Sequence, residues 1–322
     1  MHLLTLLLSA LLLAAHVPAH SQTWPARPIR ILNGGGPGSP LDIFARGIAQ
    51  RLGKELKQTI VIENRPGANQ LIVAEQCSKA APDGYTLCMV SQEPITNNPY
   101  MFKSLPYDVE KGFTPIAMMA TPVAMVLTNA QTGVKTLSQA VALSKSRPGT
   151  MNWGSYGIGS ASHLYLEGIR NETAWDVTHV PFTDPTKALT ALLRNDVQFI
   201  YTLPNATVKP HLDSGALVPV LFAGSPRHPR FPDVQTFDEA GLGKYFVRGM
   251  WSLLGPAGLP SEVVQRVNRV ANEVIRDPEL DEMLTALSLN RLTGTPDDLA
   301  DSLRRIRSQM GPAFARANVQ PN

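Results

Sequence analysis

The stretch from residue 28 to residue 56, PIRILNGGGPGSPLDIFARGIAQRLGKEL, decides the fold class of this chain. Pro28 to Leu32 is rich in β-branched residues and predicts a strand. Asn33 to Pro40 is a glycine-rich turn, and apolar residues recur at helical spacing from Leu41 to Leu56. A strand, a tight turn and an amphipathic helix in this order form the unit from which α/β folds are built.

The same alternation continues along the chain. Further strands are expected at 59–63, 85–90, 113–119, 123–128, 151–154, 176–180, 197–201 and 217–222, and further helices at 72–80, 137–144, 160–170, 186–194, 207–214, 261–275 and 298–314. This order predicts α/β units with mainly parallel sheets. Two shifts in composition, at 98–108 and at 224–232, predict that the chain crosses into a second domain and later returns.

The N-terminus predicts export. Leu3 to Ala15 is an apolar run that ends in the small-residue stretch from Val17 to Ser21, although the residues before it carry only His2 and no Lys or Arg. We expect a signal peptide that is cleaved after Ser21, because the run is shorter than the roughly 20 residues of a membrane span. The mature chain of about 300 residues suggests two domains. Its small net charge of +3, scattered along the chain, argues against nucleic acid as a partner.

The two cysteines, Cys77 and Cys88, lie on an expected helix and on the following strand. An exported compartment permits a disulfide between them. Two buried free thiols are the alternative, and the sequence leaves both open. A zinc site at this pair is not expected, because structural zinc takes four ligands and no His lies nearby.

Two glycine-rich turns predict a site for an anion. One is Asn33 to Ser39 and the other is Gly154 to His163, and each stands between an expected strand and an expected helix. Ligands of α/β sheets bind beyond the carboxyl ends of strands, where loop amides and helix N-termini offer unpaired N–H groups. Neither turn has the spacing of a nucleotide-binding motif, so no cofactor is expected. Ordinary tight turns remain the alternative.

Catalytic and metal-binding patterns are weak. Ser155 and Ser160 lie near glycines, but neither occupies a G-x-S-x-G elbow. His163, three residues after Ser160, suits a cap or a core contact better than a catalytic base. No metal site is expected, and we predict no catalytic residue and no enzyme. The alternative from another class is a secreted α/β serine hydrolase that uses Ser155 or Ser160.

Short motifs in the same order along the mature chain resemble a known receptor family. They include Trp24-Pro25-Ala26-Arg27-Pro28, Glu63-Asn64-Arg65-Pro66-Gly67, Pro82-Asp83-Gly84-Tyr85-Thr86, Leu105-Pro106-Tyr107-Asp108, His179-Val180-Pro181-Phe182 and Pro256-Ala257-Gly258. The chain is similar in these motifs to the Bug-type receptors, the substrate-binding proteins of tripartite tricarboxylate transporters.

The resemblance implies a type II periplasmic-binding fold, in which two α/β lobes enclose a ligand cleft. Lobe 1 would comprise residues 22–103 and 226–322, and lobe 2 residues 104–225. A small organic acid or amino acid would be the ligand, and the permease subunits of the transporter the membrane partner, with the receptor in the periplasm. The implied ligand-binding residues are Gly35, Gly36, Pro37, Gly38, Ser39, Ser91, Gln92, Ser155, Gly159, Ser160, Ser162, Thr183 and Asp184.

The chain departs from the family pattern at several of these places. It has Gly34 and Gly35 where the family commonly has proline and phenylalanine, and Ser39, Asn69, Gln70 and Asp184 where the family has glycine. An acid at position 184 would repel a second carboxylate and attract an amine. We therefore expect an amino-bearing or mono-acid ligand, with Asp184 as a helix cap being the alternative. A receptor fold reused in a sensor is a third function that the sequence leaves open.

Overall fold

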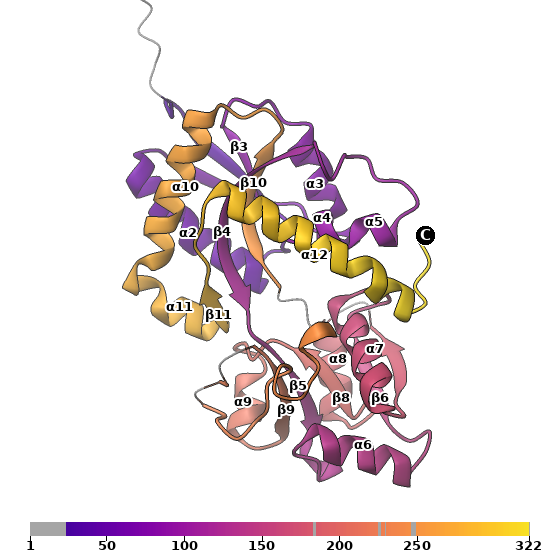
Figure 1. Ribbon diagram of the computed structural model, residues 1–322. Coiled ribbons are helices and arrows are strands. Elements are labelled where there is room, and N and C mark those ends of the chain that lie inside the picture. The colour runs from indigo at the N-terminus through magenta and orange to yellow at the C-terminus, as the bar shows by residue number, and fades with distance from the viewer. Residues whose placement is uncertain (1–23, 183–184, 225–226, 229, 246–248, 322) are drawn as a thin grey trace, which may run out of the picture.

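The computed structural model describes residues 24–182, 185–224, 227–228, 230–245 and 249–321, which form two lobes (Figure 1). Each lobe has a sheet covered by helices on both faces. The expected signal peptide and its cleavage site lie outside the described residues. Within the described part of the chain, no helix is both long and apolar enough to cross a membrane.

The first lobe is built on a six-stranded sheet ordered β11-β4-β10-β3-β1-β2. Its strands are β1 (Ile29–Asn33), β2 (Ile60–Asn64), β3 (Thr86–Ser91), β4 (Phe113–Pro122), β10 (Trp251–Pro256) and β11 (Leu289–Arg291). Its helices are α2 (Pro40–Leu56), α3 (Leu71–Ser78), α4 (Glu93–Thr96), α5 (Asn98–Met101), α10 (Ser261–Arg276), α11 (Asp281–Ala286) and α12 (Pro296–Arg316).

Alternation along β3 explains why both faces of this sheet are covered. Leu87 and Met89 pack into the cluster formed with α2, α10 and α11, whereas Cys88 and Val90 pack into the cluster formed with α3 and α12. Successive side chains of a strand point to opposite faces, so a strand that is apolar throughout needs cover on both sides.

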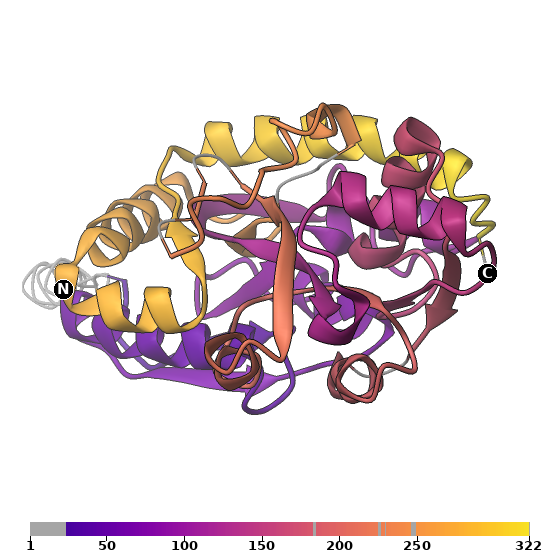
Figure 2. The ribbon, with the colours of Figure 1, turned by 90° about the horizontal axis from the view of Figure 1, so that it is seen from below.

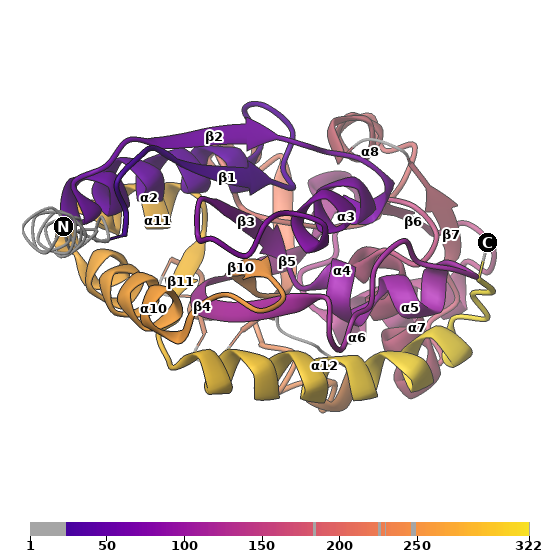
Figure 3. The same cartoon turned by 90° about the horizontal axis from the view of Figure 1, so that it is seen from above.

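The second lobe has a five-stranded sheet ordered β7-β6-β8-β5-β9. Its strands are β5 (Ala124–Asn129), β6 (Asn152–Ser155), β7 (Thr178–Pro181), β8 (Phe199–Thr202) and β9 (Leu217–Ala223). Helices α6 (Leu137–Ser146) and α7 (Ala161–Thr173) cover one face, and α8 (Pro185–Leu193) and α9 (Lys209–Asp213) the other. Seen from below and from above, α12 extends beyond the first lobe and lies against α7 (Figures 2 and 3).

The structure corrects three expectations about this architecture: the direction of the strands and the positions of both crossings. The sheets are mixed, because β10 is antiparallel to β3 and β4, and β5 is antiparallel to β8 and β9. The first crossing also comes later than residue 104. Strand β4 pairs with β10 and β11 in the first sheet, and only Val123 separates β4 from β5.

The aromatic-rich segment that suggested a crossing is part of the first lobe. The Tyr107 hydroxyl donates to the Pro94 carbonyl at 2.9 Å and accepts from Asn98 Nδ2 at 2.9 Å, so the segment is fixed rather than a linker. The return also comes later than residue 226. Phe237 and Leu242 are buried in the core of the second lobe, which places the segment around them in that lobe.

A disulfide joins Cys77 of α3 to Cys88 of β3, with 6.2 Å between the Cα atoms. Both cysteines are fully buried at the helix–sheet interface. Of the two alternatives that the sequence left open, the structure therefore has the bridge.

Reducing this disulfide is expected to lower the free energy of unfolding by about 3 kcal/mol, because a crosslink over a short loop restricts the unfolded chain. Urea unfolding with and without reductant measures the difference. A Cys77→Ala/Cys88→Ala double variant should be similarly destabilised and insensitive to reductant. Equal unfolding midpoints for the oxidised and reduced protein would contradict the bridge.

Candidate functional site

Each lobe contains a glycine turn that ends in a serine cap, and the two turns have nearly the same backbone geometry. In the first turn (residues 33–39), Gly38 has φ +75° and Ser39 caps α2 with φ −67° and ψ 159°. In the second turn (residues 155–160), Gly159 has φ +75° and Ser160 caps α7 with φ −66° and ψ 158°. Positive φ favours glycine, and the serine that follows accepts a bond from the N–H three residues ahead.

Asp42 holds the first turn in place. This buried carboxylate accepts the Gly38 N–H at 2.9 Å and Asn64 Nδ2 at 2.7 Å, and it pairs with Arg46 at 3.0 Å. Asn64 Nδ2 also donates to the Gly35 carbonyl at 2.7 Å. Burial alone would raise the pKa of Asp42, but the bonds from Arg46, Asn64 and Gly38 outweigh it and hold the pKa below its usual value.

Trp153 and two histidines support the second turn. Trp153 is fully buried, and its Nε1–H donates to the Ser162 carbonyl at 3.1 Å. His163 Nδ1 accepts the Gly159 N–H at 3.1 Å, and the His163 ring stacks on the His179 ring with centroids 4.0 Å apart. The buried Trp153 and the two stacked imidazole rings therefore hold the second turn in place.

Backbone donors remain free at both turns. Among the described residues, no partner is present for the N–H groups of Gly36 and Leu41 at the first turn, or of Ala161 and Ser162 at the second. The first N–H groups of a helix have no acceptor inside the helix and carry a partial positive charge. Each turn can therefore bind one carboxylate group without any basic side chain.

A chain of contacts links the two turns. The Gln70 side chain lies so close to Gly34 that a Cβ there would overlap it. Its neighbour Asn69 donates through Nδ2 to Asn98 Oδ1 at 2.7 Å and to Met101 Sδ at 3.4 Å. Met101 in turn packs against Gly159 of the second turn. The first and second turns thus border the same region between the lobes.

The structure sorts the predicted site residues into three groups. Gly35, Gly36, Pro37, Gly38, Ser39, Gly159 and Ser160 form the two turns, with Ser39 and Ser160 as caps. Ser91, Gln92, Ser155 and Ser162 are buried, and the Gln92 side chain accepts the Met250 N–H. Ser91 bonds to Gln70. Thr183 and Asp184 lie outside the described residues.

Ser155 and His179 form a contact that invites comparison with a hydrolase. Ser155 Oγ lies 2.6 Å from His179 Nε2. Burial, together with His163, lowers the pKa of His179 to about 4, so the ring is neutral at neutral pH. However, Ser155 is fully buried and also bonds to the Gly157 backbone, and no described carboxylate hydrogen-bonds the other ring nitrogen of His179. The pair shapes the second turn, and an orienting acid for a triad is missing from the described residues.

The sequence reasoning missed Gln70 as a contact of the first turn and missed Glu93 altogether. Glu93 begins α4, two residues after the end of β3, on the edge where ligands of α/β sheets bind. An acidic residue just after the end of a strand was the signal in the sequence that could have marked this position. Its importance depends on residues of the other lobe, which local sequence does not reveal.

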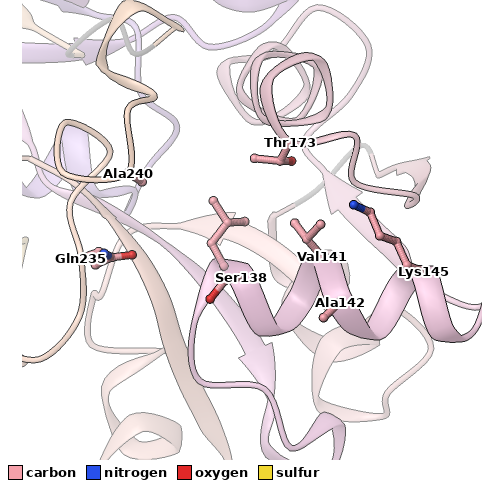
Figure 4. A pocket seen from close by; sticks show the side chains of 8 residues that line it. Ser138, Val141, Ala142, Lys145, Thr173, Gln235 and Ala240 are labelled. Atoms are coloured by element: carbon pink, nitrogen blue, oxygen red, sulfur yellow. The ribbon is translucent and has the colours of Figure 1, made fainter.

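A described hollow in the second lobe lies away from both turns. A space of about 450 Å³ opens between α6 and the segment around Gln235 and Ala240 in the second lobe (Figure 4). Figure 4 shows Ser138, Val141 and Lys145 of α6 along one side of it. The hollow touches neither turn, and its few polar groups do not converge, so it lacks the features of a specific site.

Two α/β lobes, joined by crossing segments and each presenting a capped turn, define a solute-binding protein of the type II periplasmic-binding fold. A family model described as "Tripartite tricarboxylate transporter family receptor" matches residues 44–311, and the chain belongs to this family. The resemblance seen in the motifs is confirmed. The family is one of transporter receptors, and nothing in the comparisons supports the serine hydrolase.

Individual relatives cover almost the whole chain. The chain is 32% identical to a UPF0065 protein of Bordetella bronchiseptica, over 98% of this chain and 94% of that protein. It is 29% identical to Protein BugT of Bordetella pertussis, over 89% and 90%. The solved structure of MatC from Rhodopseudomonas palustris with bound malate is similar, with a TM-score of 0.75 and 29% identity, over 90% of this chain and 99% of that one.

Proposed function

We propose that this receptor captures a small carboxylate-bearing molecule between its lobes in the periplasm and delivers it to the permease of a tripartite tricarboxylate-type transporter. The observation that carries the proposal is the pair of equivalent capped turns, one in each lobe, with free backbone N–H groups. That the related MatC was solved with malate supports a carboxylate as the ligand class.

The two turns would act as an anion clamp. A carboxylate at the first turn would accept from Gly36 and Leu41, and one at the second turn from Ala161. Binding would draw the lobes together, because one ligand then bonds to both. Thr183 and Asp184 complete the proposed lining, and Asp184 keeps its proposed preference for an amine or a mono-acid.

A thermal-shift screen of small acids on the mature protein tests the ligand class. A ligand present at about 100 times its Kd should add about 2.7 kcal/mol to the free energy of unfolding and raise the unfolding midpoint. Calorimetry then gives the affinity of each binder. If no carboxylate in a broad panel raises the midpoint, the proposal is wrong.

Two cap variants show whether the turns hold the ligand. Ser160→Ala removes the cap of the second turn, and Thr136→Ala removes the cap of α6, at the far end of the same lobe. Each should cost about 1 kcal/mol of stability. We expect only Ser160→Ala to weaken ligand binding, by about ten-fold, which corresponds to about 1.4 kcal/mol. Equal affinity in the two variants would exclude the second turn from the site.

A further inference from the structure

A buried acid lies beside the first turn, at the boundary between the lobes. Glu93 Oε2 is fully buried and has no hydrogen-bond partner among the described residues, although part of the residue reaches solvent. No described Lys, Arg or His forms an ion pair with this carboxylate either. A buried carboxylate oxygen without a partner is unfavourable, and most such groups in proteins are paired.

The other side of Glu93 is held by a short polar network. Gln70 Nε2 donates to Ser91 Oγ at 2.6 Å, and the Ser91 N–H donates back to Gln70 Oε1 at 3.1 Å. The Ser91 side chain, whose oxygen already accepts from Gln70, hydrogen-bonds Glu93 in turn. The network fixes the carboxylate next to the first turn and leaves Oε2 unsatisfied.

Two tyrosines of the second lobe lie near this acid, because Ile95 of α4 and Leu164 of α7, close to Glu93 and Tyr165 in the chain, belong to one buried apolar cluster. Tyr165 of α7 and Tyr201 of β8 have ring centroids 4.7 Å apart. Burial raises the pKa of both hydroxyls, and the negative charge of Glu93 raises them further, which places all three groups within electrostatic reach. The acid of one lobe and the aromatic pair of the other therefore border one region.

The Glu93 carboxylate and the two tyrosine rings favour a positively charged group of the ligand. Aromatic faces and a carboxylate both attract a cation, and a carboxylate repels an anion. We propose that Glu93, Tyr165 and Tyr201 form a subsite for the positively charged nitrogen of the ligand, so that the receptor selects carboxylates that also carry an amine. This inference rests on the proposed function, since the ligand's carboxylate would occupy the turns.

The ionisation of Glu93 agrees with such a subsite. Burial raises the pKa of Glu93, while hydrogen bonds from the Ser91 side chain and from its own backbone N–H oppose the shift. An ammonium group in contact with the acid would lower this pKa again. An amine-bearing ligand would place a positive charge beside this carboxylate.

Matched ligand pairs test the inference by calorimetry on the mature protein. L-Glutamate is compared with glutarate and L-aspartate with succinate, because the members of each pair differ only in the amine; longer diacids and their α-amino forms extend the panel. The wild-type protein should bind at least one amine-bearing member ten-fold or more tightly than its partner. Glu93→Gln keeps the shape and removes the charge, and it should reduce this preference to about two-fold or less.

Glu279→Gln is the matched control, because Glu279 lies on the surface of the first lobe away from both turns. It should leave the preference unchanged. If the panel's carboxylates bind without preference for the amine, or if Glu93→Gln preserves the preference, the inference is overturned while the proposed function stands. If no member of the panel binds, both fall. Tighter binding of the plain diacids than of their amino forms by the wild type would also overturn the subsite.

Discussion

Replacing Asp42 with alanine is expected to lower the free energy of unfolding by about 3 kcal/mol and to abolish measurable ligand binding. The variant removes the acceptor of the buried Asn33 amide and of two part-buried donors, the Gly38 N–H and the Asn64 amide. Each buried donor that loses its partner costs about 1–3 kcal/mol. Urea unfolding at neutral pH measures the stability, and calorimetry with the acid identified in the screen measures the binding.

Arg46→Ala serves as the control for the ion pair. Arg46 is about half exposed, so losing its pair with Asp42 should cost less than about 1 kcal/mol. The pH dependence has a defined sign, because the folded protein holds the pKa of Asp42 below its usual value. The stability that Asp42 adds is present above its unfolded pKa of about 3.9 and is lost as the pH falls through the folded pKa. If both variants lost the same stability, Asp42 would matter only as a surface charge.

Replacing Trp153 with alanine should cost about 4 kcal/mol and weaken the second turn. Its ring is fully buried and packs edge-on against Trp175 with centroids 5.8 Å apart. Removing a buried aromatic side chain leaves a large cavity, and such substitutions cost about 3–5 kcal/mol. Because Trp153 also donates to the Ser162 carbonyl at the start of α7, ligand affinity should fall as well.

Trp153→Phe separates the two roles of this side chain. Phenylalanine keeps most of the apolar contact and loses the N–H donor, so we expect a cost of about 1–2 kcal/mol from the unpaired Ser162 carbonyl and the smaller ring. Thermal unfolding and calorimetry on both variants measure stability and affinity. Unchanged affinity in Trp153→Ala would show that the second turn does not depend on the core beneath it.

Local patterns in the sequence predicted the turns well and the sheets less well. The strand β1, the turn and the helix α2 follow from neighbouring residues, because the glycines and the Ser39 cap act within a few positions. The sheet to which β4 belongs depends on pairing with Trp251–Pro256, far away in the chain. Such pairing leaves no mark in the strand itself, which is why the crossing was placed too early.

The difference between local and distant contacts also explains which site residues the sequence could predict. Ser39 and Ser160 were predicted as ligand-binding residues from the resemblance, and the structure has them as the caps of α2 and α7. Ser155 and Gln92 were expected to face the ligand, yet His179 and Met250 hold their side chains inward, and both partners are distant in sequence. Glu93 belongs to no motif, and its proposed role in binding a positively charged nitrogen depends on tyrosines of the other lobe.

Val123, the single residue between β4 and β5, forms the first of the two crossings between the lobes. The Val123 N–H donates to the Ser288 carbonyl at 2.8 Å, and Ser288 Oγ donates to the Pro204 carbonyl at 3.0 Å, so this joint is braced from both sides. A short braced joint acts as a pivot: the lobes can swing about it but can hardly slide or separate. A permease that distinguishes the liganded receptor from the free one would then recognise the angle between the two lobes.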